Sequence, residues 1–373
     1  MIVEVPERIF VENIEIFILL IVVAVAVLLN ALVFAQIVST TKTPTVRTNF
    51  LTGPYHKNSF QLFKLNLCIS DFFILLIYAL GKIVWLTTFE WKLGNSGCKL
   101  YKFFSSFSFY ANSNIIVAIA LDRLKVVYTT QIQGATSVRR VRCMIFGCWL
   151  FAFLCSFPQF FIWRTMPVGS TWEQCVTIFA VANYHNATTE LLERSAIFYE
   201  IGHQFTVFWL PLMTILISYI LIVLKLLHYS LRAREKIKIA RFSDSEERPL
   251  TNSFDVFGKR VKRKSRWENF LQLNMIKKQR DTPRPVSGIT LHRTKSWPTW
   301  RSQLGSRVFR SACLIVVTHI TLWLPYNTIS ATRFIDQEFY QRVMENGGNF
   351  LEDLIVVNSL LNPLLYAQRR CRK

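Results

Sequence analysis

Residues 16–38 have the sequence IFILLIVVAVAVLLNALVFAQIV, an uncharged and strongly apolar run of 23 residues. A helix rises about 1.5 Å per residue, so about 20 apolar residues are enough to cross the hydrocarbon core of a bilayer. The run is too long for the apolar part of a secretory signal peptide, and the residues before it are acidic: Glu4, Glu7, Glu12 and Glu15. We therefore predict that it stays in the protein as a first membrane-spanning helix.

Six further apolar stretches follow the first one. They cover residues 61–86, 98–128, 143–163, 197–227, 308–330 and 350–367, of which the last is a little short. The whole chain is 51% hydrophobic and contains 31 Phe, which is more aromatic surface than a water-facing protein accommodates. Because lipid offers no partner to an unpaired backbone amide, the stretches should be helices. The predicted fold class is an all-α membrane protein, a bundle of seven transmembrane helices.

The distribution of charge predicts the orientation. With the N-terminus outside, the inner segments are 39–60, 129–142, 228–307 and 368–373, and they carry 30 Lys/Arg against 7 Asp/Glu. The outer segments carry 6 basic and 11 acidic residues. Since long loops count little, we also omit 228–307, which leaves 10 basic residues and no acid inside. The N-terminus is therefore predicted to lie outside, in a multi-pass protein of the plasma membrane.

The same boundaries divide the chain into four parts. Residues 1–15 form an extracellular N-terminus, and the seven-helix domain covers 16–367. That domain is interrupted by a long basic loop, 228–307, and a very short cytoplasmic tail, 368–373, follows it. The loop is predicted to be largely disordered because it has too little apolar surface to bury, although its first part should continue the fifth helix. Its basic residues suit anionic membrane lipid. Nucleic acid is not an expected partner, because it would explain the charge but not the seven spans.

Two cysteines and a glycosylation sequon fall on the predicted outer side. Cys98 and Cys175 lie in a compartment that permits disulfides, and a bond between them would join the second outer loop to the third helix. The sequon Asn186-Ala187-Thr188 lies in the same loop, so Asn186 is a predicted glycan site.

Several polar side chains fall inside the predicted spans, where they are costly and therefore candidates for function. They are Asp71, Asn30, Ser108, Asn112, Asn358 and Ser359. One buried carboxylate among oxygen-bearing neighbours is able to hold a hydrated Na⁺ ion. The same residues are also able to form a hydrogen-bond network that only joins helices. The sequence leaves both alternatives open, and no other cofactor is expected.

Sequence landmarks occur in register along the spans. They include Asn66 with Asp71, Leu121-Asp122-Arg123, Trp149, Pro211 with Tyr219, Trp323-Leu324-Pro325, and Asn362-Pro363-Leu364-Leu365-Tyr366. Prolines kink membrane helices and supply hinges. Over the whole chain apart from the long inner loop, these landmarks resemble those of the rhodopsin-type G-protein-coupled receptors.

The resemblance implies a receptor that binds an extracellular ligand and activates heterotrimeric G proteins by outward movement of helix six. The residues that it assigns to this switch are Asp122, Arg123, Tyr219, Trp323, Pro325, Asn362, Pro363 and Tyr366. One departure concerns Gly305, which stands where some relatives carry an acid that holds Arg123. Asp122 is therefore expected to provide more of the restraint, with some basal activity as the consequence.

The ligand is predicted from the outer half of the spans. Ser105 stands where amine receptors carry an aspartate, and Val356 where opsins carry a lysine, so neither ligand class fits. Charges of both signs and aromatic residues suit a peptide. The candidate ligand-binding residues are Lys82, Lys102, Ser105, Glu200, His203, Tyr326, Asn327 and Glu352. An internal salt bridge between Lys82 and Glu352 is the alternative for those two residues.

Lys102 and the stretch Trp323-Leu324-Pro325-Tyr326-Asn327 resemble the gonadotropin-releasing-hormone and vasopressin receptor group, which implies a neuropeptide ligand. The alternatives are a lipid or small-molecule ligand, or an orphan receptor that signals constitutively. The chain has no paired carboxylates at one site, no cluster of metal ligands and no Gly-rich phosphate loop, so we do not expect an enzyme.

Overall fold

The computed structural model describes residues 10–42, 54–129, 135–168, 172–246 and 307–367. Most of the predicted N-terminal segment, most of the long inner loop and the predicted tail 368–373 lie outside these ranges. The described residues form two units. One contains the bundle, and the other, Leu226–Thr299, is described only as far as its helical beginning.

The seven predicted spans are helices. The first four comprise α1 (Phe10–Lys42), then α2 (Pro54–Phe73) with η1 (Ile74–Ala79) and α3 (Leu80–Thr88), then α4 (Gly94–Tyr128), and then α5 (Ala135–Ser156). The other three comprise α8 (Glu190–Gln204) with η2 (Phe205–Trp209) and α9 (Leu210–Glu246), then α12 (Arg307–Thr332), and then η3 (Gly348–Asp353) with α14 (Leu354–Ala367). We refer to these groups as transmembrane helices one to seven.

Six helices of the described chain are long and apolar enough to cross a membrane. Helix seven is shorter, as its sequence indicated: α14 has 14 residues and is about 21 Å long. Helix five is longer than the predicted 197–227, because it begins outside at Glu190 and α9 continues to Glu246. The expected helical continuation beyond residue 228 is therefore present.

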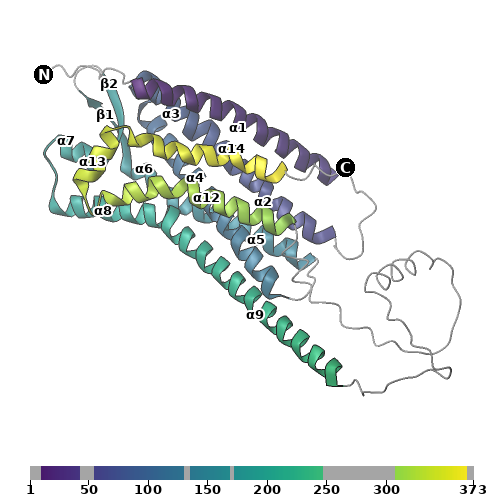
Figure 1. Cartoon of the computed structure of the whole chain (residues 1–373). Coiled ribbons are helices and arrows are strands. Elements are labelled where there is room, and N and C mark those ends of the chain that lie inside the picture. Colours follow the sequence, from purple (N-terminus) through teal and green to yellow (C-terminus); the bar gives the residue numbers. More distant parts are fainter. Residues whose placement is uncertain (1–9, 43–53, 130–134, 169–171, 247–306, 368–373) are drawn as a thin grey trace, which may run out of the picture. The chain divides into compact units, whose positions relative to one another are not determined.

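Helix three is the central element of the bundle. It packs against helices two, four and six, while helix seven packs between helices one and six (Figure 1). Its buried face includes Tyr110, Asn112 and Ile116, and large apolar side chains such as Phe63, Phe208 and Trp323 fill the space around it. Because the helix is buried on most of its circumference, its polar residues face other helices rather than lipid.

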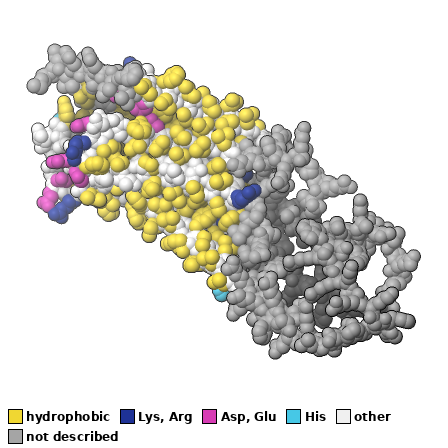
Figure 2. All heavy atoms as spheres, in the orientation of Figure 1, with side chains coloured by type: hydrophobic (Ala, Val, Ile, Leu, Met, Phe, Trp, Pro, Cys, Tyr) yellow, Lys and Arg dark blue, Asp and Glu magenta, His cyan; other side chains and the backbone are white. Residues whose placement is uncertain are grey.

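The outward surface of the bundle is apolar. In helix one, the large apolar side chains of Phe17, Leu28 and Leu32 are more than half exposed. Figure 2 shows hydrophobic side chains over the middle of the visible face, with charged side chains gathered at the end that carries α8 and α13 (Gln337–Glu345). An apolar band of this kind is the surface that lipid covers.

The second outer loop contains structure that the sequence analysis did not predict. It forms an antiparallel hairpin of β1 (Trp163–Val168) and β2 (Trp172–Thr177), with Thr165 opposite Cys175. The short helices α6 (Gln159–Ile162) and α7 (Ile178–Tyr184) flank it. The all-α class therefore holds for the membrane domain, and the hairpin is an addition on its outer side.

Candidate functional site

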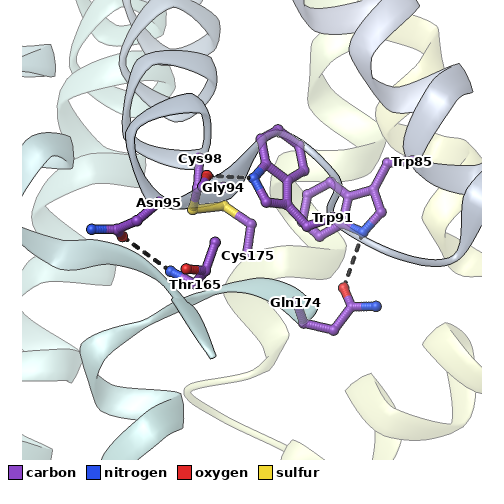
Figure 3. The surroundings of a disulfide bond; sticks show 8 residues. All are labelled: Trp85, Trp91, Gly94, Asn95, Cys98, Thr165, Gln174 and Cys175. Carbon is purple, nitrogen blue, oxygen red and sulfur yellow. Dashed lines mark hydrogen bonds between the residues drawn. A yellow bond between two sulfur atoms is a disulfide. The ribbon is translucent and has the colours of Figure 1, made fainter. Parts of the chain in front are cut away.

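The hairpin is fastened to the outer end of helix three by a disulfide between Cys98 and Cys175, whose Cα atoms are 5.6 Å apart (Figure 3). This confirms the predicted bond. Three hydrogen bonds support it: Thr165 N donates to Asn95 Oδ1 (3.2 Å), Trp85 Nε1 to Gln174 Oε1 (3.0 Å), and Trp91 N to Glu173 O (2.8 Å). The hairpin is thus held by helices two and three and by the turn between them.

Asn186 lies between α7 and α8 on this same outer side. It is exposed and has a positive φ of 51°, a conformation that Asn tolerates better than most residues. The position suits the predicted glycan site, which remains a prediction.

Lys82 on helix two connects helices one and seven. Its ammonium lies 2.9 Å from Glu15 Oε1 and 2.5 Å from Asp353 Oδ1, and all three side chains are at least 86% buried. The salt-bridge contacts of Lys82 are therefore with Glu15 and Asp353, while the expected partner Glu352 acts on its ammonium electrostatically from a greater distance.

Lys102 on helix three is enclosed by aromatic rings. Its ammonium lies 4.1 Å from the ring centre of Trp163, 4.8 Å from that of Trp85 and 5.6 Å from that of Tyr101. A cation on the faces of several rings is stabilised by their negative electrostatic potential. Gly81 makes room for this arrangement, because a Cβ atom there would overlap the Tyr101 ring.

The other predicted ligand-binding residues lie around the same outer end. Glu200 forms an ion pair with Arg333 (2.9 Å), and His203 Nδ1 is 2.9 Å from the Tyr110 hydroxyl. The side-chain amide of Asn327 donates to Trp323 O (2.8 Å), and its backbone carbonyl accepts a hydrogen bond from the Gln204 side chain (2.6 Å). Ser105 is buried, while Tyr326 and Glu352 are half-buried. The structure thus brings helices two, three, five, six and seven together around these side chains.

Trp323 marks the floor of this outer region. Its ring is 1% exposed and contacts Phe109 edge-on, with the ring centres 5.9 Å apart. On its inner side it lies 4.6 Å from the ring of His319, one turn earlier on the same helix. Pro325 follows within α12, where its ring nitrogen has no hydrogen to donate to the backbone of the preceding turn.

Asp71 is the centre of the polar network and is completely buried. Its carboxylate accepts hydrogen bonds from Asn112 (3.0 Å), Ser359 (2.9 Å) and Asn362 (3.1 and 3.2 Å). Asn30 joins helix one to this network by donating to Ser359 O (2.9 Å). Helices two, three and seven therefore meet at a single carboxylate, and helix one is attached through the backbone of Ser359.

Two predicted members of the network behave differently. Ser108 donates to the carbonyl of Ser105 on its own helix (2.7 Å), so it does not contribute its hydroxyl to Asp71. Asn358 is fully buried, but neither atom of its amide has a hydrogen-bond partner among the described residues. Pro363 is buried in α14, one residue after Asn362.

The inner end of helix three carries the Asp122-Arg123 pair. The two side chains form an ion pair and are 2% and 3% exposed. Asp122 also accepts a hydrogen bond from Arg140 of helix four, at 2.6 Å. Tyr219 of helix five packs against the apolar cluster below this pair. Gly305 and the side chain of Tyr366 lie outside the part of the chain that is described.

The arrangement is that of a membrane receptor, and sequence comparison agrees with it. The family model described as "7 transmembrane receptor (rhodopsin family)" matches residues 29–366. The chain therefore belongs to the rhodopsin family of seven-transmembrane receptors, which are signalling proteins of the membrane and not enzymes.

Its similarity to individual receptors is modest, and two of the matches extend over most of the chain. It is 28% identical to the G-protein coupled receptor daf-38 of Caenorhabditis elegans, over 97% of this chain and 89% of that protein. It is 24% identical to the gonadotropin-releasing hormone receptor of Octopus vulgaris, over 83% and 62% of the two chains. The cephalotocin receptor 1 of the same species is 33% identical over 28% of this chain and 26% of its own length.

Sequence reasoning missed several residues of the site. Glu15 was assigned to the N-terminal segment, Asp353 was passed over for its neighbour, and Arg140 was counted only as an inner charge. The rings around Lys102 come from helix two, helix three and the hairpin, so no local sequence pattern joins them. The contact between Arg140 and Asp122 could have been predicted, because Asp122 and the basic residues of the next helix were both expected at the inner membrane surface.

Proposed function

We propose that this receptor responds to an extracellular peptide at the plasma membrane and then activates heterotrimeric G proteins. The observation that carries the proposal is the composition of the outer end. Paired charges of both signs, tyrosine hydroxyls and amide groups lie at the end of the bundle that carries the disulfide-linked hairpin. A peptide offers the termini, amides and side chains that such a set of partners recognises.

The relatives give additional support for a peptide. Two of those from Octopus vulgaris are named as receptors for gonadotropin-releasing hormone and for cephalotocin. The candidate contacts are Lys82, Lys102, Ser105, Glu200, His203, Tyr326, Asn327 and Glu352, which come from five helices. We place the ligand above Trp323, because the aromatic cluster closes the bundle below that level.

The signal would pass inward through Trp323 and Asp71 to Arg123. A ligand shifts an equilibrium only by the difference between its affinities for the two states. A ligand that rests on Trp323 is positioned to favour movement of helix six about Pro325. Arg123 is then released from Asp122 to face the G protein, with Tyr219 and Tyr366 moving in behind it. Pro363, next to Asn362, would adjust helix seven in the same step.

Asp71 and its neighbours fit a Na⁺ ion as well as a plain network. The side-chain oxygens of Asn112, Asn358 and Asn362 are buried and accept no hydrogen bond from a described residue. Together with the Asp71 carboxylate, they would supply the hard oxygen ligands that Na⁺ requires. We propose that Na⁺ binds here in the resting state, and that Asp71→Asn reduces the effect of Na⁺ on agonist potency. If Na⁺ has its full effect on agonist potency in that variant, Asp71 and its neighbours form a hydrogen-bond network and not a Na⁺ site.

The test of the function is a library of neuropeptides applied to cells that express the full chain, with G-protein activation as the readout. A saturable response that requires the receptor supports the proposal. Responses to lipids or small amines but not to peptides would overturn the peptide assignment. A high signal without any ligand, unchanged by the whole library, would identify a constitutive receptor instead.

A further inference from the structure

We propose that the aromatic ring of Phe60 holds the Arg123 guanidinium in the resting receptor, so that helix two takes part in the restraint at the inner end. The inference rests on the proposed function and deepens it, because it adds a positioning residue to the switch that would couple the receptor to G proteins. It starts from the stabilisation of Arg123 that the ion pair with Asp122 does not provide.

The guanidinium of Arg123 is buried with few hydrogen bonds. Its side chain is 3% exposed and donates to Asp122, while its Nε has no hydrogen-bond partner among the described residues. The same carboxylate also binds the guanidinium of Arg140 at 2.6 Å. One carboxylate shared by two guanidinium groups leaves positive charge in an apolar region, where it is costly. Arg123 therefore needs a further source of stabilisation.

An aromatic ring lies where that stabilisation is needed. The guanidinium carbon of Arg123 lies over the ring of Phe60, 5.2 Å from the ring centre. A guanidinium is planar and weakly hydrated, so it packs well on an aromatic face, and the attraction is stronger where water is excluded. Phe60 is 1% exposed, so both partners are shielded from water. The contact joins helix three to helix two.

The position of the Phe60 ring is fixed by its neighbours. The ring belongs to an apolar cluster that also contains Phe63 of helix two, Ile119 of helix three and Val141 of helix four. Helix two packs against both of these other helices. Outward movement of helix six does not carry the ring along. Arg123 therefore has to leave the ring in order to turn toward a G protein.

A second cation lies over the same ring. Lys64 follows Phe60 by one turn of helix two, and its ammonium is 5.0 Å from the ring centre. Lys64 is itself 5% exposed. Lys64 and Arg123 carry like charges, so each weakens the hold of the ring on the other. This competition makes the restraint on Arg123 reversible, and a test has to separate the two cations.

The test varies the electrostatic potential of the ring at almost constant shape. Phenylalanine with one, two or three ring fluorines is introduced at position 60 of the full-length receptor. Each fluorine withdraws electron density from the ring face and weakens its attraction for a cation. The readout is ligand-free G-protein activation at matched surface expression. The matched control is the same series at Phe63, which is buried in the same cluster and has no cation over its ring in the part of the chain that the structure describes.

Basal activation should rise stepwise with fluorination at position 60, roughly fivefold for the trifluorinated ring, and stay nearly constant in the series at position 63. A ring that only fills space would not respond to its own electrostatic potential in this way. Equal changes in the two series would therefore overturn the proposal.

Repeating the position-60 series with Lys64→Met identifies the cation. A rise that persists without the Lys64 ammonium assigns the effect to Arg123. A rise that disappears assigns it to Lys64 and contradicts the proposal. Where Lys64→Met does not reach the cell surface, Lys64→Gln removes the same charge.

A second measurement separates this proposal from the proposed G-protein function. A fluorophore sensitive to its surroundings is attached to Arg310→Cys, at the exposed inner end of α12, in a Cys143→Ser background. Its emission reports movement of helix six without a G protein. The fluorinated Phe60 series and Asp122→Asn should shift this emission in the same direction.

The outcomes of the two measurements differ for the two proposals. Emission shifts in the Phe60 series without any G-protein signal would retain the restraint and refute the coupling function. A shift with Asp122→Asn alone would refute the role of Phe60. The absence of a shift in every variant would refute the restraint on Arg123 as a whole.

Discussion

The two ends of the bundle are held together in different ways. At the outer end, Lys82 joins helices one, two and seven, and the Cys98–Cys175 bond joins helix three to the hairpin. At the inner end, Asp122 and Arg123 are neighbours on one helix, and Arg140 of helix four forms a second ion pair with Asp122. The outer cross-links preserve the shape of a binding region. Among the described residues, the ion pairs of Asp122 link helix three to helix four and not to helix six.

Under the proposed function, this difference allows one bundle to bind a ligand at one end and to move at the other. A ligand site needs side chains from several helices at fixed positions, and links between distant parts of the chain provide that. A coupling site needs helix six free to swing outward, so a restraint confined to helices two, three and four is suitable. A substitution at one end of the bundle should therefore change the property assigned to that end and leave the other end nearly unchanged.

The largest effect is expected from Lys82→Met. Removing one partner of a buried ion pair leaves the carboxylates of Glu15 and Asp353 uncompensated, which costs about 3 kcal/mol or more. The amount of receptor at the cell surface and its thermal stability in detergent should fall together. Adding Glu15→Gln and Asp353→Asn removes all three charges and should restore much of the loss. The exposed Lys92→Met serves as control. No rescue would mean that Lys82 acts through something other than charge.

The disulfide comes next. Replacing Cys98 or Cys175 by Ser releases the hairpin and should cost ~2–4 kcal/mol of stability. The double variant should be no worse than either single one, because all three lack the same bond. Surface expression and any ligand response measure this. Clearly additive losses would show that the two cysteines contribute separately.

At the inner end, Asp122→Asn should raise ligand-free signalling several-fold while leaving surface expression nearly unchanged. The restraint on Arg123 weakens, which corresponds to about 1 kcal/mol in the balance between the two states. Arg140→Ala removes the contact to helix four and should change basal signalling less. The readout is G-protein activation without ligand at matched surface levels. A quiet Asp122→Asn receptor contradicts the restraint.

The smallest effect is expected from Asn186→Gln. It should remove the mass of one glycan and change signalling little, since Asn186 is exposed.

The orientation in the membrane is a separate prediction. An epitope at residue 1 should be accessible to antibody on intact cells, and one inserted near residue 287 only after permeabilisation. The reverse pattern would contradict the orientation derived from charge.

Much of this architecture could be predicted from sequence, for reasons that differ between its parts. Apolar length determines the spans, because lipid leaves the backbone no alternative to a helix. The Cys98–Cys175 bond followed from the orientation. The hairpin could not be predicted, since β1 and β2 are short strands whose supporting contacts, the disulfide and hydrogen bonds to Trp85 and Trp91, come from other segments.

The partners of the charged residues were harder to predict than their positions. Choosing Asp353 rather than Glu352 requires the rotation of each residue in a 3₁₀ turn, and sequence does not reveal where that turn ends and α14 begins. The rings around Lys102 come from three separate segments. Asp71, by contrast, could be predicted from sequence, because an acidic side chain in the middle of a membrane span is costly and therefore marks a candidate functional residue.

The central claim is that a binding region on the outside controls Arg123 on the inside. Its most direct test combines two substitutions without any ligand. Asp122→Asn should raise basal G-protein activation, and adding Arg123→Ala to that variant should abolish the increase at equal surface expression. Adding the exposed Arg139→Ala instead should leave the increase in place. Persistent signalling by the Asp122→Asn, Arg123→Ala receptor would show that this residue does not couple the bundle to G proteins.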